Sequence, residues 1–209
     1  MRRLLKALGA SCQVGRVRIR TTDRNHEHWR YPNLLKQLAI THPDQAWVAD
    51  ITYIRLGHRF IYLAVILDVY TRAVRGWAVS RNIDKQLTIA ALRMALAQGH
   101  PLIFHSDQGV QYAAWEHTEL LQATLVQISM ADAGQPTQNA FVERFIRTFK
   151  EEHVDFADYD SFDDACQQIG HWLEVTYNTL RIHSAHDYLT PAEFEVAFLD
   201  RQTSLFALA

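Results

Sequence analysis

The chain has 209 residues, 48% of them hydrophobic, so it is long enough to bury one main core. No run approaches the roughly 20 apolar residues of a membrane-spanning helix, and the apolar segment after Met1 is too short for a signal peptide, so we expect a cytoplasmic protein. Cys12 and Cys166 lie far apart without zinc-ligand spacing, which argues against a disulfide framework and a zinc site.

The formal net charge of −2 at pH 7 is unevenly distributed along the chain. Residues 1–36 contain nine Lys or Arg and two Asp or Glu, a net charge of +7, which leaves −9 on the remainder. A basic arm joined to an acidic body suits a phosphate-contacting segment attached to a domain whose carboxylates bind cations. A solvated basic tail is an equal alternative on charge alone. The candidate DNA contacts of the arm are Arg16, Arg18 and Arg20.

Helix-stopping residues and the loss of periodicity indicate where the folded domain begins. Residues 2–8 look like the end of a helix that Gly9 stops, and the basic, polar stretch after it has no steady periodicity. We therefore expect a basic N-terminal arm over residues 1–40, a core domain over residues 41–197 and a C-terminal tail over residues 198–209.

Three predicted strands precede the first long helix of the core. Residues 47–56 and 59–69 are rich in β-branched and aromatic residues and are separated by a turn at Gly57, which predicts a hairpin. A third strand is expected over residues 73–80. Residues 84–98 then have helical periodicity, with an acidic start and a glycine behind the end.

The remaining elements predict an α/β fold. Short strands are expected over residues 102–105 and 126–129, with a helix near residues 113–124 between them. Two further helices are expected from residue 137 to about 156 and from residue 161 to 177, the second of which begins at a capping pattern.

Asp50 interrupts an otherwise apolar strand, WVADITYI, in which Val48, Thr52 and Ile54 share its face. An ionised carboxylate buried without a partner is strongly destabilising, so the side chain must be hydrogen-bonded, paired with a cation or bound to a metal. Taken alone, Asp50 fits a hydrogen bond to a neighbouring segment as well as it fits a metal site.

Two further acids occupy positions that suit a shared site. Asp107 follows the short strand LIFH, at the carboxyl end where open α/β sheets usually place catalytic groups, although the position also suits a turn. Glu143 lies on a polar helix stripe with Asn139, Arg147 and Lys150, which alone is typical of a solvated face. Together, the three acids can supply oxygen ligands to two divalent cations, an arrangement that catalyses phosphodiester chemistry without a histidine base.

Five sequence blocks resemble the retroviral-integrase-like DDE transposases of the rve superfamily, specifically the second reading-frame product of the IS3 insertion-sequence family. Asp107 and Glu143 are separated by 35 residues, as in that family. The blocks follow the family's order over about residues 30–195: WVADITYI, YLAVILDVYTRAVRGWAVS, FHSDQGVQY, NAFVERFIRTFKEE and YNTLRIHSAHDYLTPAEFE.

The resemblance implies an RNase H-like fold, with a five-stranded mixed sheet flanked by helices. It implies that Asp50, Asp107 and Glu143 are both the catalytic residues and the metal ligands, that the cofactors are two Mg²⁺ or Mn²⁺ ions, and that the reaction is DNA cleavage and strand transfer during transposition. The implied partners are element ends, target DNA and further copies of the chain. An upstream reading-frame product that carries a helix-turn-helix is another candidate partner.

The resemblance also adds DNA contacts and leaves rival functions open. In the block YNTLRIH, packing of the segment is an equal alternative to DNA contact. Gln138 stands where many relatives have Asp, and the family's helix-turn-helix region is mostly missing from the arm. A regulatory DNA-binding remnant of a transposase and an RNase H-fold nuclease that cuts without joining are the two alternatives. The candidate DNA contacts of the core are Asn139, Arg147, Lys150, Arg181 and His183.

Overall fold

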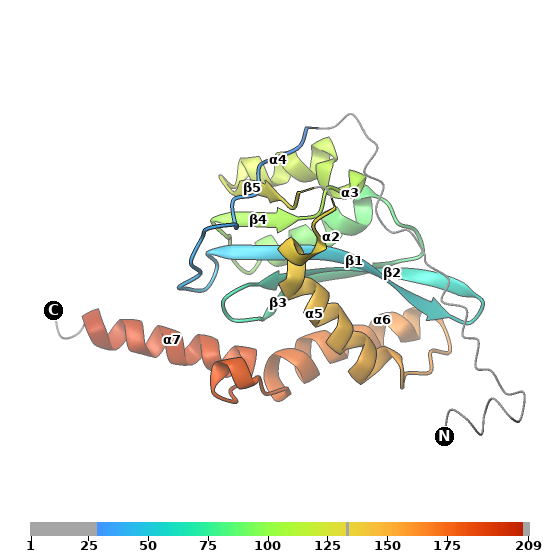
Figure 1. Ribbon diagram of the computed structural model, residues 1–209. Helices are drawn as coiled ribbons and strands as arrows, with labels where there is room; N and C mark the ends of the chain where they lie inside the picture. Colours follow the sequence, from blue (N-terminus) through green and yellow to red (C-terminus); the bar gives the residue numbers. More distant parts are fainter. Residues whose placement is uncertain (1–28, 133, 207–209) are drawn as a thin grey trace, which may run out of the picture.

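A five-stranded mixed sheet forms the centre of the computed structural model, which describes residues 29–132 and 134–206 (Figure 1). The sheet order is β3-β2-β1-β4-β5; β1 pairs antiparallel with β2, β2 antiparallel with β3, and β4 parallel with both β1 and β5. The prediction of a mixed five-stranded sheet is confirmed. The strands are β1 (Ala46–Leu56), β2 (Arg59–Asp68), β3 (Val74–Ser80), β4 (Ile103–Ser106) and β5 (Gln127–Met130).

Helices cover both faces of the sheet (Figure 1). One face packs against α2 (Lys85–Leu96), α3 (Val110–Ala113) and α4 (Trp115–Ala123). The other face packs against α5 (Ala140–Phe149) and α6 (Phe162–His171), and α7 (Pro191–Phe206) follows them in the chain. None of the helices within the described residues is both long and apolar enough to cross a membrane.

The alternation of β1 explains the two hydrophobic cores. Val48 and Ile54 belong to the core beneath α5 and α6, whereas Trp47, Ala49 and Ile51 belong to the core beneath α2 and α4. Side chains of successive strand residues point to opposite faces, so the face predicted for Asp50 is the α5 face. Packing on both faces of the sheet buries most of β1, whereas Asp50 itself stays partly accessible to solvent.

Both long helices of the α5 face end in π-helical turns that the sequence did not predict. In η2 (Lys150–Val154), the backbone N–H after the turn, at Asp155, donates to the oxygen of Lys150 at 2.9 Å. In η3 (Trp172–Leu180), the N–H of Arg181 donates to the oxygen of Thr176 at 2.8 Å. Such i→i+5 bonds add one residue to a helical turn and are frequent at functional sites.

Three further details differ from the expected elements. The helix expected near residues 113–124 is divided at Ala114, whose backbone is extended, into α3 and α4. Helix α7 was not predicted, and it continues without a break through the expected boundary between core and tail at residue 197. Short 3-10 turns also occur as η1 (Pro136–Asn139) and η4 (Ser184–His186).

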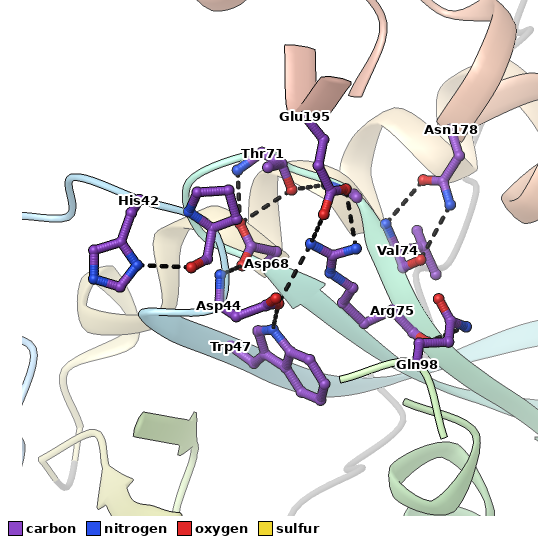
Figure 2. A network of polar contacts seen from close by, with 12 residues as sticks. His42, Asp44, Trp47, Asp68, Thr71, Val74, Arg75, Gln98, Asn178 and Glu195 are labelled. Atoms are coloured by element: carbon purple, nitrogen blue, oxygen red, sulfur yellow. Dashed lines mark hydrogen bonds and ion pairs between the residues drawn. The ribbon is translucent and has the colours of Figure 1, made fainter. Parts of the chain in front are cut away.

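A polar network fastens α7 to the sheet (Figure 2). Arg75 of β3 donates from Nη1 to Glu195 Oε2 at 3.0 Å and from Nη2 to Glu195 Oε1 at 2.6 Å, and its Nη2 lies 3.3 Å from Asp44 Oδ1. The carboxylate of Asp68 is buried and accepts hydrogen bonds from the backbone of Asp44 and from both donors of Thr71. Charged groups are thus paired where they leave solvent, as burial of a charge requires.

The described part of the expected N-terminal arm packs on the core. Leu34, Leu35 and Leu38 are partly buried against the core of the α5 face, and the backbone N–H of Leu34 donates to Ser129 Oγ at 2.9 Å. The arm arginines proposed as DNA contacts lie outside the described residues: Arg16, Arg18 and Arg20.

Candidate active site

Asp50 sits in the middle of β1, opposite Val65 of β2. Its Oδ1 accepts a hydrogen bond from the backbone N–H of Ile51 at 2.7 Å. Burial raises the pKa of Asp50 to about 8, with further upward contributions from the charges of Asp107 and Glu143. Asp107 and Glu143 therefore both lie within electrostatic reach of Asp50, although the three acids come from separate elements.

The parallel pairing of β1 with β4 explains why Asp107 approaches Asp50. Val48 pairs with His105 in this ladder, so Asp50 and Asp107 each lie two residues beyond a matched pair and on the same side of the sheet. Asp107 directly follows β4, and its Oδ1 accepts from the backbone N–H of Gly109 at 3.0 Å. Asp107 is thus both a turn residue and a neighbour of Asp50. The two interpretations of its sequence position, a turn and a place beside other acids, are compatible.

Glu143 comes from the first turn of α5 and is exposed. Burial raises the pKa of Glu143, while the charge of Arg147, one helical turn later, lowers it. Asn139, just before the helix, is 4% exposed and donates from Nδ2 to the backbone oxygen of Ala49 at 3.0 Å. Asn139 therefore joins the start of α5 to the strand residue that precedes Asp50, which is a positioning contact.

The acids approach one another without forming a complete set of metal ligands. Among the described residues, no three His, Cys, Asp or Glu side chains are grouped closely enough to hold one ion. Like charges repel, which opposes a closer approach of carboxylates unless a cation lies between them. The arrangement therefore combines two acids from neighbouring strands with a third acid from the first turn of α5.

Lys150 places a positive charge beside the acids. Its Nζ lies 4.3 Å from the centroid of the Tyr53 ring, and the charge of Asp50 acts against the lowering of the Lys150 pKa by burial. Arg147 is exposed on the same helix. Of the predicted DNA contacts, three thus lie near the acids: Asn139 just before α5, Arg147 on it and Lys150 directly after it.

Arg181 and His183 lie in a different place. They line a cavity of about 630 Å³ whose lining includes none of the three acids. Arg181 makes a two-pronged ion pair with Glu152, from Nε and Nη2, at 2.7 Å each. Burial and the neighbouring Arg181 lower the pKa of His183 to about 4, so its ring is neutral at pH 7. The structure therefore separates the predicted core contacts into two groups.

The structure explains why a glutamine suits position 138, where many relatives have Asp. Its Oε1 accepts from Asn33 Nδ2 and from the backbone N–H of Asp132, each at 2.7 Å, and its Nε2 donates to Asp132 Oδ2 at 3.0 Å. A carboxylate could not make the last bond because it has no donor. Gln138 therefore ties the loop before α5 to the segment that contains Asn33.

Tyr112 is a neighbour of the acids that sequence reasoning missed. It lies on α3, is 3% exposed, and its hydroxyl has no hydrogen-bond partner among the described residues. Burial raises its pKa well above the ordinary value, and the charges of Asp50 and Asp107 raise it further. The only available signal was its place five residues after Asp107, which alone does not distinguish a core tyrosine from a site residue.

Comparison with known proteins gives the family. The sequence matches the family described as Integrase core domain over residues 40–136, and a second family of the same description over residues 124–191. It is 34% identical over 197 residues to the transposase for insertion sequence element IS904 of Lactococcus lactis subsp. lactis, an alignment that covers 92% of this chain and 78% of that protein. The chain belongs to the integrase-core transposases of the IS3 insertion-sequence family.

Other relatives support the same assignment. This transposase chain is 38% identical over 196 residues to the insertion element IS600 uncharacterized 31 kDa protein of Shigella sonnei, which covers 92% of the chain and 72% of that protein. It is 35% identical over 167 residues to transposase InsF for insertion sequence IS3A of Escherichia coli, covering 78% of the chain and 58% of that protein.

Solved structures show the fold of this transposase chain. The HTLV-2 integrase catalytic core domain in complex with magnesium matches 74% of the chain and 97% of that protein, with a TM-score of 0.59 and 20% identity. The simian T-cell lymphotropic virus intasome structure matches 91% of the chain and 66% of its own, with a TM-score of 0.64 and 20% identity. The predicted RNase H-like fold is confirmed.

Proposed function

We propose that this transposase core cleaves DNA at insertion-sequence ends and joins them to target DNA, with Asp50, Asp107 and Glu143 as its catalytic acids. The observation that carries the proposal is the parallel β1–β4 ladder that places Asp50 and Asp107 side by side, with Asp107 and Glu143 both close enough to contribute to the raised pKa of Asp50. A buried carboxylate surrounded by like charges favours protonation or a bound cation. Of these two outcomes, the bound cation is the one that phosphodiester chemistry needs.

The donor set fits Mg²⁺ or Mn²⁺. All three acids offer carboxylate oxygens, the ligands that hard divalent cations prefer, and the described neighbourhood contributes no thiolate. Two such ions supply Lewis-acid stabilisation of the attacking and leaving oxygens of a phosphodiester. The magnesium complex of the HTLV-2 integrase core, which shares the fold, supports this choice of metal.

Each side chain then has a distinct task. Asp50 and Asp107 would hold the cations from two adjacent parallel strands, which fix the spacing of the two carboxylates. Glu143 would supply a third carboxylate from the first turn of α5. Arg147 and Lys150, on the same side of α5, contact the phosphates of the strand that reacts, because cationic side chains position DNA through its backbone.

Element ends and target DNA are the proposed partners, and the chain acts as a homo-oligomer on them in the bacterial cytoplasm. Joining two element ends to one target requires at least two active sites, which favours more than one copy. An upstream reading-frame product with a helix-turn-helix is a further proposed partner. The dimeric and trimeric forms of the HTLV-2 integrase core, which share the fold, support the oligomeric arrangement.

A strand-transfer assay tests the function. The full chain is incubated with a labelled, precleaved element end and plasmid target in Mg²⁺, Mn²⁺ or EDTA, beside an active full-length relative. We expect joined product in either metal, none in EDTA, and none from Glu143→Gln. The matched control is Glu119→Gln, another exposed helical glutamate, which should join normally. Cleavage without joining would favour the nuclease, and no product beside an active relative would favour the regulatory remnant.

A further inference from the structure

The cavity that contains Arg181 and His183 lies across α5 from the acids. Phe141, Arg144 and Thr148 form its α5 wall. At 3.6 residues per turn, Glu143 projects about 200° around the helix from Phe141, so the cavity and the acids use different faces of one helix. Arg144 and Arg147 are both exposed on the helix surface between them. A strand passing over α5 can therefore reach both places.

The charge of the cavity is positive. Arg72, Arg144 and Arg181 line it, and the acids nearby already have partners. The Asp68 carboxylate accepts from Asp44 and Thr71. Glu152 forms its ion pair with Arg181, and its charge also acts on Arg144 at longer range. Among the described residues, the guanidinium groups of Arg72 and Arg144 form no ion pair with a carboxylate, so the cavity keeps a net positive charge that suits an oxyanion.

Arg72 is the most unusual of these residues. Its backbone is left-handed, with φ of 63°, a conformation that non-glycine residues seldom adopt and that clusters at functional sites. Its guanidinium lies 3.9 Å from the centroid of the Phe141 ring, and its Nη1 is buried without a hydrogen-bond partner. Burial lowers its pKa. An unsatisfied buried donor is destabilising, so an acceptor supplied by a ligand would improve the site.

The rim of the cavity is aromatic and open to solvent. Tyr188 is 66% exposed and Phe141 is 45% exposed, although both are large apolar side chains. The backbone of Tyr188 is also left-handed, with φ of 63°. Flat exposed rings beside arginines are the arrangement by which proteins hold unpaired bases and their phosphates.

We propose that this cavity binds one nucleotide of an unpaired DNA strand, with its phosphate at Arg72 and Arg144 and its base against Tyr188. The inference rests on the proposed function only in taking DNA as the substrate, since it requires neither the acids nor a metal. Its place across α5 assigns it to a strand segment beyond the reacting phosphodiester, not to the scissile bond itself. The cavity thereby fixes the path of the strand past Glu143.

Binding of a labelled single-stranded oligonucleotide, followed by fluorescence anisotropy in EDTA, tests the phosphate contact. Arg144→Gln should weaken binding about fivefold or more and reduce the slope of log K against log salt by about 0.7, the value for one lost phosphate contact on a single strand. The matched control is Arg93→Gln, an exposed arginine of α2 on the opposite face of the sheet, which should leave the slope unchanged. Equal slopes for both variants would overturn the proposal.

An abasic oligonucleotide tests the base contact. Tyr188→Ser should weaken binding of the normal strand about fivefold or more, because stacking on an aromatic ring is lost, and should leave binding of the abasic strand unchanged. An equal loss for both strands would show that the ring holds no base. Arg72→Gln removes the second proposed phosphate contact, and its binding is interpreted only if its thermal unfolding matches that of the wild type. If Arg72→Gln is destabilised, the binding of Arg144→Gln alone tests the phosphate contact.

The same samples separate this inference from the proposed function. Glu143→Gln should abolish joining in Mg²⁺ while its binding in EDTA stays at the wild-type level. If Glu143→Gln loses joining while Arg144→Gln binds normally, the catalytic role of Glu143 is supported and nucleotide binding by the cavity is rejected. If Arg144→Gln binds weakly while Glu143→Gln joins normally, nucleotide binding by the cavity is supported and the catalytic role of Glu143 is rejected.

Discussion

The side chain of Asn178 pairs with both backbone groups of Val74 (Figure 2). Its Oδ1 accepts from the Val74 N–H at 2.9 Å, and its Nδ2 donates to the Val74 oxygen at 3.0 Å. Val74 begins β3, an edge strand of the sheet, where backbone groups otherwise lack a neighbouring strand. One amide thus substitutes for a strand at this point, so the Asn in the block YNTLRIH has a packing role.

Removing this amide should destabilise the fold. Asn178→Ala takes away two hydrogen bonds and leaves the groups of Val74 unpaired, which predicts a loss of about 2–3 kcal/mol in the free energy of unfolding. Urea unfolding measures it. Asn82→Ala, at an exposed turn residue, is the control and should change stability by less than about 0.5 kcal/mol. Similar losses in the two variants would mean that the Val74 contact contributes nothing special.

Asp50 should make the metal-free protein less stable as pH rises. Its pKa in the folded state, about 8, exceeds the ordinary 3.8, so the folded state binds the proton more tightly than the unfolded state. The stability it supports is present below the unfolded pKa and is lost as pH rises toward about 8. Asp50→Asn should therefore stabilise the chain on the order of 5 kcal/mol at about pH 8 in EDTA, and little at about pH 4.

Thermal unfolding of Asp50→Asn across that pH range gives the comparison. Asp160→Asn, an exposed aspartate in the turn before α6, serves as the control and should follow the wild-type curve. If the difference in stability between Asp50→Asn and the wild type were the same at all pH values, the proposed titration would be contradicted. The amide cannot titrate, so the difference should change with pH wherever the carboxyl of Asp50 does.

Mg²⁺ should stabilise the chain through the acids. A ligand that binds only the folded state adds about 2.7 kcal/mol when present at 100 times its dissociation constant. The increase in melting temperature should be much smaller in Asp107→Asn, which lacks one proposed ligand, whereas Glu119→Gln should respond like the wild type. Equal responses of all three proteins would place the ion elsewhere.

Gly76 should not tolerate a side chain. A Cβ added there would lie 2.3 Å from the backbone oxygen of Ala91 and 2.8 Å from the Cβ of Ala95, so β3 and α2 would have to separate. Gly76→Ala should cost about 1–3 kcal/mol by overpacking. Gly99→Ala is the control, since its Cβ would meet Asp44 Oδ2 at an ordinary 3.6 Å. Chemical unfolding of the two variants compares them, and equal stabilities would refute the close packing of β3 on α2.

The strands and the face that carries Asp50 could be predicted because local pattern determines them: side chains alternate along WVADITYI. The parallel ladder that brings Asp107 beside Asp50 joins segments distant in sequence, so it is known only from the fold. The helix-borne position of Glu143 was also predictable from periodicity. Whether these acids perform catalysis stays a prediction.

Other features depend on partners distant in sequence. Arg75 meets Glu195 across 120 residues, and Asn178 meets Val74 across 104, separations over which no periodicity indicates a contact. The left-handed backbone of Arg72 and the π turns arise from local strain that packing elsewhere holds in place. The sequence pattern does not indicate these contacts or backbone conformations. The cavity beside α5, which depends on them, could therefore be found only in the structure.

The π turn over Lys150–Val154 holds one residue more than the corresponding α-helical turn. Deleting a single residue within it would yield a regular α-helix whose preceding part, with Glu143 and Phe149, keeps its orientation. The same deletion inside Ala140–Phe149 would turn the two parts of the helix by about 100° relative to each other. Length changes among related chains should therefore accumulate at this turn and spare the segment before it.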